Sequence, residues 1–137
     1  MRNLFILAFA TVFLAGCSGA PSTEVEGDTE TETQTQVEAD QSSPEAVVES
    51  FFALYMNGDR EEALALVEED SRAFLDGMLE GLESEGWEYT RVDVESVEGN
   101  EVTVYMEIDI SGEMDSGSDQ VEVVEADGMW WIVDLPL

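Results

Sequence analysis

Two residue types that carry much of enzyme chemistry are missing from this chain. It has no histidine, and its 4 basic residues are all arginines, so lysine is missing too. Without histidine, imidazole acid–base catalysis and the Ser-His and Cys-His nucleophile arrangements are excluded. Without lysine, Schiff-base chemistry is excluded. Catalysis would have to combine a carboxylate with Tyr55, Tyr89 or Tyr105. We expect no enzyme and no catalytic residue, because the carboxylates of the strands fall on polar positions.

Cysteine is almost absent as well. Cys17 is the single cysteine of the chain, so no intrachain disulfide can form. A zinc site would lack its usual nitrogen and sulfur ligands. The acidic stretch from Glu113 to Asp119 resembles a cation loop, but it lacks the ligand order of an EF-hand. We therefore expect a flexible loop over residues 111–119, with no metal and no cofactor.

Positive charge is scarce throughout. The chain has 33 Asp and Glu against its 4 arginines, a formal net charge of −29. No basic patch could replace the counterions of phosphates, so a nucleic-acid partner is excluded. The acids could bind a cationic partner or Ca²⁺, or form a solvated shell suited to high salt. Because they are spread along the whole chain, the pattern favours a halophilic, salt-adapted organism.

The sequence also lacks a long hydrophobic run. The apolar residues from Leu4 to Phe13 are too few to span a membrane, which takes about 20 residues. They follow Arg2 and lead into Leu14-Ala15-Gly16-Cys17. This start resembles a lipoprotein signal peptide that ends in a lipobox. An ordinary cleaved signal is the alternative.

The lipoprotein resemblance implies a signal peptide over residues 1–16 and cleavage before Cys17. It also implies acyl chains such as palmitate on the Cys17 thiol. The mature protein would be a membrane-anchored, extracytoplasmic protein of the cell envelope. Ser18 stands where an Asp would favour the inner membrane, so we expect the outer membrane or the cell surface. Residues 17–43 are rich in Thr, Glu and Gln and predict a disordered acidic linker.

The folded part is expected over residues 44–137, with helices first. Ser43 and Pro44 are typical of a helix start, and apolar residues follow at helical spacing to Tyr55. Asn57-Gly58 ends this helix, Asp59 begins a short second one, and Ser71 begins a third. Apolar residues predict that the third helix presents one face to the core: Phe74, Leu75, Met78, Leu79 and Leu82.

After Gly86 the hydrophobic period changes from helical spacing to two. Residues 102–110 alternate strictly, which is the clearest strand signal in the chain. Further strands are expected around Val92, over residues 121–124 and, after the Asp127-Gly128 hairpin signal, over 129–135. The order predicts an α+β fold, three N-terminal helices packed on a curved four-stranded antiparallel sheet.

Three short segments carry a family resemblance: residues 43–52 (SPEAVVESFF), the Asn57-Gly58-Asp59 break and residues 127–133 (DGMWWIV). In this order they resemble the NTF2-like (cystatin-like) superfamily, most closely its small lipoproteins of the DUF4878 type. The resemblance covers about residues 43–135 and implies a cone between helices and sheet. The cone would be filled by its side chains or would hold a small apolar ligand. The candidate pocket residues are Phe52, Tyr55, Phe74, Met78, Val104 and Met106.

Adjacent tryptophans near the C-terminus indicate a second candidate surface. Neighbours on a strand face opposite sides, so one of Trp130 and Trp131 lies inside. The resemblance implies that Trp130 and Ile132 face the helices. The expected outward residues form a candidate contact surface for a homodimer or a protein partner: Tyr105, Val124, Trp131 and Val133. Trp87 is expected to plug the core; the alternative is a ring that stacks on a ligand. The function expected from all this is a non-catalytic binding or protein-interaction module; the alternatives are a ligand carrier and, less favoured, an isomerase- or dehydratase-like enzyme.

Overall fold

A computed structural model describes residues 37–136 of the chain. The expected signal peptide over residues 1–16, the lipidation residue Cys17 and the linker as far as residue 36 lie outside the described residues. Val37 packs against the hydrophobic core, and Gln41 bonds to Trp130. Contacts with the folded part therefore begin several residues before Pro44, where the sequence predicts the domain to start.

Three helices occupy the first half of the described part: α1 (Pro44–Met56), α2 (Arg60–Leu64) and α3 (Glu69–Ser84). Ser43 caps α1, because its Oγ accepts a hydrogen bond from the backbone N–H of Ala46 at 3.1 Å. The third helix begins at Glu69, two residues before the expected Ser71, and its first turn is acidic. Acidic side chains there are favourable because the helix dipole is positive at that end.

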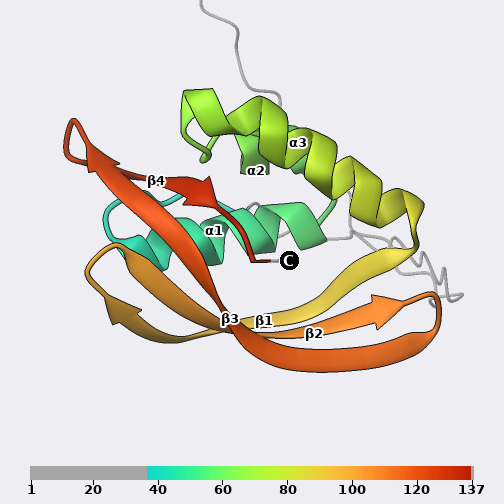
Figure 1. Cartoon of the computed structure of the whole chain (residues 1–137). Helices are drawn as coiled ribbons and strands as arrows, with labels where there is room; N and C mark the ends of the chain where they lie inside the picture. Colours follow the sequence, from blue (N-terminus) through green and yellow to red (C-terminus); the bar gives the residue numbers. More distant parts are fainter. Residues whose placement is uncertain (1–36, 137) are drawn as a thin grey trace, which may run out of the picture. The chain divides into compact units, whose positions relative to one another are not determined.

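Four strands follow: β1 (Trp87–Glu98), β2 (Glu101–Ile110), β3 (Glu113–Ala126) and β4 (Met129–Asp134). They pair in the order β1-β2-β3-β4, and every neighbouring pair is antiparallel. Helix α1 contacts all four strands, and α3 contacts β1 and β4 (Figure 1). The α+β class, with helices N-terminal to an open antiparallel sheet, is therefore confirmed.

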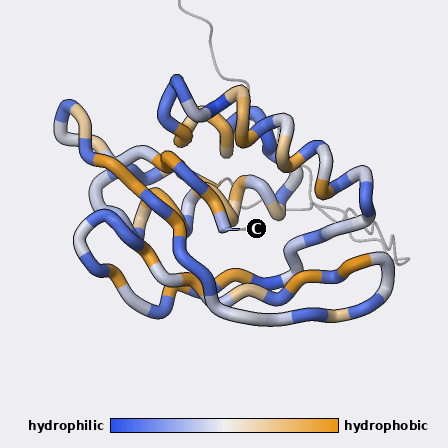
Figure 2. The backbone as a smooth tube through the Cα atoms, in the orientation of Figure 1, coloured by the Kyte–Doolittle hydropathy of each residue, from blue (hydrophilic) through white to orange (hydrophobic). Residues whose placement is uncertain are grey.

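The expected loop over residues 111–119 is wrong. Only Ser111 and Gly112 form the turn, both at positive φ (55° and 94°), and β3 begins at Glu113. Pairing then continues without a break from Ile110↔Glu113 to Glu101↔Glu122. Residues 113–120 are all exposed, so backbone hydrogen bonds hold this part of β3 without an apolar face. Figure 2 shows the contrast between the hydrophobic positions of β2 and this hydrophilic half of β3.

The core lies between α1 and the inner face of the sheet. Val102, Val104, Val121 and Val123 are fully buried, as the period of two predicts. From α1, Val47, Val48 and Phe51 pack on them. Ser50 is the only polar residue among residues 37–136 that falls in the buried class.

The free edge of β4 is covered by two short segments. Trp130 donates its backbone N–H to the carbonyl of Gln41 at 3.0 Å, and the Gln41 side chain donates back to the Trp130 carbonyl at 2.8 Å. Farther along, Ile132 exchanges backbone hydrogen bonds with Leu66 and Glu68. Edge strands invite pairing with other chains, so these contacts protect β4 from such pairing.

Candidate functional site

The residues expected to line an inner pocket do not all meet. Phe52, Val104 and Met106 are 2%, 0% and 7% exposed and belong to the core, and Tyr55 and Met78 are half-buried against it. Phe74 is 67% exposed, so its expected place in the pocket is wrong. The helix buries Leu75 and Leu79 instead, and a neighbouring position points about 100° away around the helix. Phe52, Val104 and Met106 are thus buried among the other side chains of the core.

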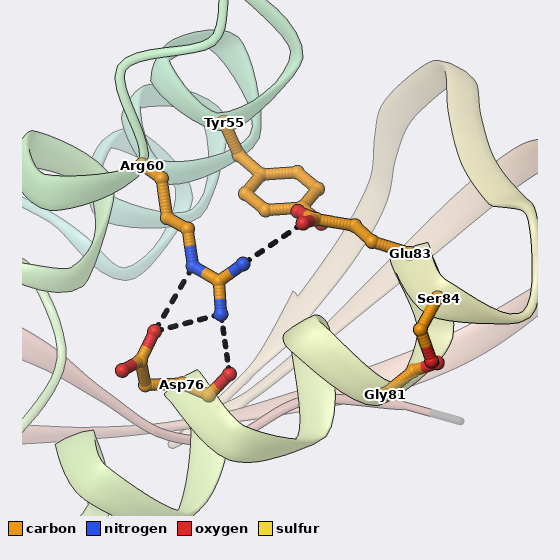
Figure 3. A network of polar contacts seen from close by, with 6 residues as sticks. All are labelled: Tyr55, Arg60, Asp76, Gly81, Glu83 and Ser84. Carbon is orange, nitrogen blue, oxygen red and sulfur yellow. Dashed lines mark hydrogen bonds and ion pairs between the residues drawn. The ribbon is translucent and has the colours of Figure 1, made fainter.

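A polar network joins the three helices beside Tyr55. The Tyr55 hydroxyl donates to Oε1 of Glu83 at 2.5 Å, and Arg60 Nη1 donates to Oε2 of the same carboxylate at 2.9 Å. Arg60 also bonds to the side chain of Asp76 through Nε and Nη2, at 2.9 and 2.7 Å. Figure 3 shows the guanidinium between the two α3 carboxylates, with the Tyr55 ring next to Glu83.

The network shifts the pKa values of its members. Burial raises the pKa of the Tyr55 hydroxyl well above its ordinary value, and the hydrogen bond to Glu83 adds to the rise. Burial acts to lower the pKa of Arg60, but the hydrogen bond to Asp76 and the charges of Glu83 and Asp76 outweigh it, so the pKa is raised. Tyr55 and Arg60 therefore stay protonated across the physiological range.

Three aromatic side chains line a small recess next to this network, which we call the aromatic recess. Its volume is about 230 Å³, and its walls are Tyr55, Met56, Gly58, Glu83, Trp87, Glu88 and Tyr89. The Tyr55 and Tyr89 rings meet edge to face, with their centroids 5.9 Å apart. Burial, together with the charge of Asp119, raises the pKa of Tyr89.

Sequence reasoning missed this recess because it assigned Trp87 to the core. Trp87 is only half-buried and lies at its wall instead. The sequence does contain a signal for the aromatic recess. Trp87 and Tyr89 are two positions apart at the start of β1, so they share a face of the strand. That face meets the C-terminal end of α1, where Tyr55 lies.

A larger recess of about 800 Å³ lies between α2 and α3. Its lining mixes arginines and carboxylates with small apolar residues: Arg60, Glu61, Leu64, Ala65, Glu69, Arg72, Ala73 and Asp76. Arg72 donates to the Val67 carbonyl at 3.1 Å, while its buried Nε has no partner. Since Nε is buried by the protein itself, it is not available to a molecule in the recess.

On the outer face of the sheet, the predicted contact residues separate into two groups. Val124 pairs with Trp131, and Ala126 pairs with Met129, so these four share the outer face of the β3–β4 hairpin. Tyr105 lies opposite Ser118, six positions before Val124 along β3. At the rise of a strand this separation is roughly 20 Å. Val133 lies at the register shift next to the hairpin and is half-buried.

The inward and outward tryptophans lie as expected. Trp130 packs against the core and Ile132 is fully buried. Trp131 is half-buried on the opposite face, and its indole N–H donates to the carbonyl of Ala126 at 3.4 Å. The Trp131 indole therefore contacts the neighbouring strand of its own hairpin.

Tyr105 is part of a charged cluster. The Arg91 guanidinium lies 5.9 Å from the centre of the Tyr105 ring and 2.6 Å from the carboxylate of Asp93. The Tyr105 hydroxyl donates to Glu107 at 3.3 Å, and Glu107 in turn lies 3.6 Å from Arg91. This part of the outer face is therefore polar.

Within residues 37–136, no group of three or more Asp and Glu side chains is placed to hold a metal ion. No helix in the same part of the chain is long and apolar enough to cross a membrane. In comparisons with known proteins, no family model and no curated protein matches the chain.

Proposed function

We propose that this protein is a lipid-anchored binding module of the cell envelope in a salt-adapted organism. Its helices and sheet would form an NTF2-like cone filled by its own side chains. Lipid on Cys17 would hold it at the outer membrane or cell surface. It would bind a partner protein through the outer face of the β3–β4 hairpin, without catalysing a reaction.

The observation that carries this proposal is a cluster of apolar side chains on one face of the β3–β4 hairpin. Val124, Ala126, Met129 and Trp131, which we call the hairpin patch, share one face of the hairpin. Val124 is 38% and Met129 41% exposed. In a chain with a net charge of −29, apolar side chains gathered on one face favour a contact surface.

Charge around the hairpin patch favours a different protein over a second copy of this one. Glu122 and Asp134 are paired on the adjoining strand positions, and Asp127 lies in the hairpin turn; all are exposed. A second copy would bring like charges to the rim of the interface, which costs free energy. A partner with a basic rim around an apolar centre fits the charge of this surface.

Two features support a non-catalytic role. Every Asp and Glu among residues 37–136 is exposed or half-buried, so none is enclosed by apolar side chains. Phe52, Val104 and Met106 fill the space where a carrier would hold an apolar ligand. Ligand carriage inside the cone is therefore the less favoured alternative.

Crosslinking of the lipidated protein in its own membranes at high salt tests the proposal. We expect a crosslinked product with a basic partner, and we expect Trp131→Ala to reduce its yield about tenfold, as for a central interface residue. Tyr105→Ala, on the same face but outside the hairpin patch, is the control and should leave the yield unchanged. Equal yields from wild type and Trp131→Ala would reject the hairpin patch. A product that contains only this chain would reject a separate partner, and an unmodified Cys17 by mass spectrometry would reject the anchor.

A further inference from the structure

The aromatic recess combines a π-rich wall with surplus negative charge. Tyr55 comes from the end of α1, and Trp87 and Tyr89 come from the start of β1, so two elements supply the three rings. Arg60 is shared between Asp76 and Glu83, one positive charge against two negative ones. The network beside the rings therefore keeps one uncompensated negative charge.

The hydrogen bonds at Glu83 restrict what this charge can attract. Oε1 accepts the hydroxyl of Tyr55, and Oε2 accepts Nη1 of Arg60. A primary ammonium is held mainly through its N–H groups, and each oxygen of Glu83 already accepts one hydrogen bond, which leaves Glu88 as the other carboxylate at the recess. A metal ion needs several oxygen ligands, which aromatic rings do not supply. An alkylated ammonium has few or no N–H groups and is attracted to ring faces and to negative charge alike.

We infer that the aromatic recess binds a small quaternary ammonium ion as a free solute, with its methyl groups against Tyr55 and Trp87 and its charge near Glu83. The size of the recess agrees with this class of ligand. At about 30 Å³ for each water molecule, 230 Å³ corresponds to roughly eight waters. That space suits tetramethylammonium or choline and excludes a drug-sized ligand. This site is separate from the hairpin patch, so neither proposal depends on the other.

Titration of the full chain with tetramethylammonium chloride tests the inference. Tryptophan fluorescence and calorimetry would follow binding at constant ionic strength, with sodium chloride as the replaced salt. We expect a saturable change with tetramethylammonium that sodium does not produce. Trp87→Leu should weaken binding about fivefold or more, because it removes one cation–π contact. Trp131→Leu removes a tryptophan outside the recess and should leave the affinity unchanged.

A second pair of variants leaves the aromatic wall intact. Met56 lines the recess and is 42% exposed, so a substitution there does not open the core. Met56→Lys brings a positive charge to the recess and should weaken binding about fivefold or more, whereas Met56→Gln should bind within twofold of wild type. The inference is rejected if sodium and tetramethylammonium give the same response. It is also rejected if Met56→Lys and Met56→Gln bind equally well, or if a folded Trp87→Leu variant binds like wild type.

Discussion

Arg60 joins α2 to α3 through two ion pairs. It is one of 4 arginines in the chain, and it bonds to two carboxylates of α3 from the first residue of α2. Glu83 then reaches the Tyr55 hydroxyl on α1. Because α2 has only five residues and cannot be stable alone, these contacts hold it in place.

Replacing Arg60 by Gln should therefore destabilise the fold. The variant keeps much of the side chain but leaves Asp76 and Glu83 without their cation, and we expect the free energy of unfolding to fall by about 1–2 kcal/mol. Part of the effect is screened by solvent, because the Arg60 side chain is 27% exposed. Urea denaturation measures it without adding salt.

Arg91→Gln is the matched control for this prediction. Arg91 also bonds to two carboxylates, but its side chain is 58% exposed, and exposed ion pairs contribute little. We expect a loss below about 0.5 kcal/mol. Equal losses for the two variants would show that Arg60 does no more than an ordinary surface arginine.

Among the elements, the β2–β3 hairpin departs most from expectation, and its turn is the place to test it. Gly112 has a φ of +94°, a conformation in which a side chain is strained. Gly112→Ala should lower the free energy of unfolding by about 1 kcal/mol. Gly117, inside β3, has no positive φ and nothing within 4 Å of an added Cβ. Gly117→Ala should therefore be neutral or stabilising, since glycine weakens strands. If residues 111–119 were a loop instead, both variants would give the same midpoint in urea denaturation.

Elements whose side chains meet the core could be predicted from the sequence, and the others could not. The alternation from Val102 to Ile110 reflects burial on one face, so β2 was recognisable. Residues 113–120 form a strand with both faces exposed, and their pairing with β2 leaves no hydrophobic period to read. The prediction for Phe74 failed for a related reason. Phe74 lies at the edge of the single apolar face of α3, and only packing decides that Leu75 and Leu79 are buried while Phe74 is exposed.

The aromatic recess shows the same limit for the candidate site. Tyr55 and Trp87 are far apart in the sequence and meet only because the end of α1 contacts the start of β1. No local sequence pattern predicts that these two elements are in contact. The pairing of Val124 with Trp131 was accessible, because Asp127-Gly128 fixes the hairpin between them. Tyr105 shares their face of the sheet, but its distance along β3 depends on a register that the sequence does not specify.

For the whole molecule, the net charge of −29 dominates its response to solution conditions. Most of the acids among residues 37–136 are exposed, and only four ion pairs offset them there. At 0.1 M salt the Debye length is about 10 Å, so neighbouring carboxylates repel one another; at 1 M it is about 3 Å. The unfolded chain spreads the same charges farther apart, and the repulsion therefore acts against the folded state.

Raising sodium chloride from 0.1 M to 1 M should consequently increase the free energy of unfolding by about 1 kcal/mol or more. The urea midpoint, followed by tryptophan fluorescence, measures the change. Sucrose at matched osmolality is the control, because it favours compact states without screening charge. If sucrose stabilises the protein as much as the salt does, exclusion of the cosolute explains the effect and repulsion does not. If the midpoint falls with salt, the ion pairs of Arg60 and Arg91 outweigh the repulsion among the acids, and the acidic surface is not an adaptation to high salt.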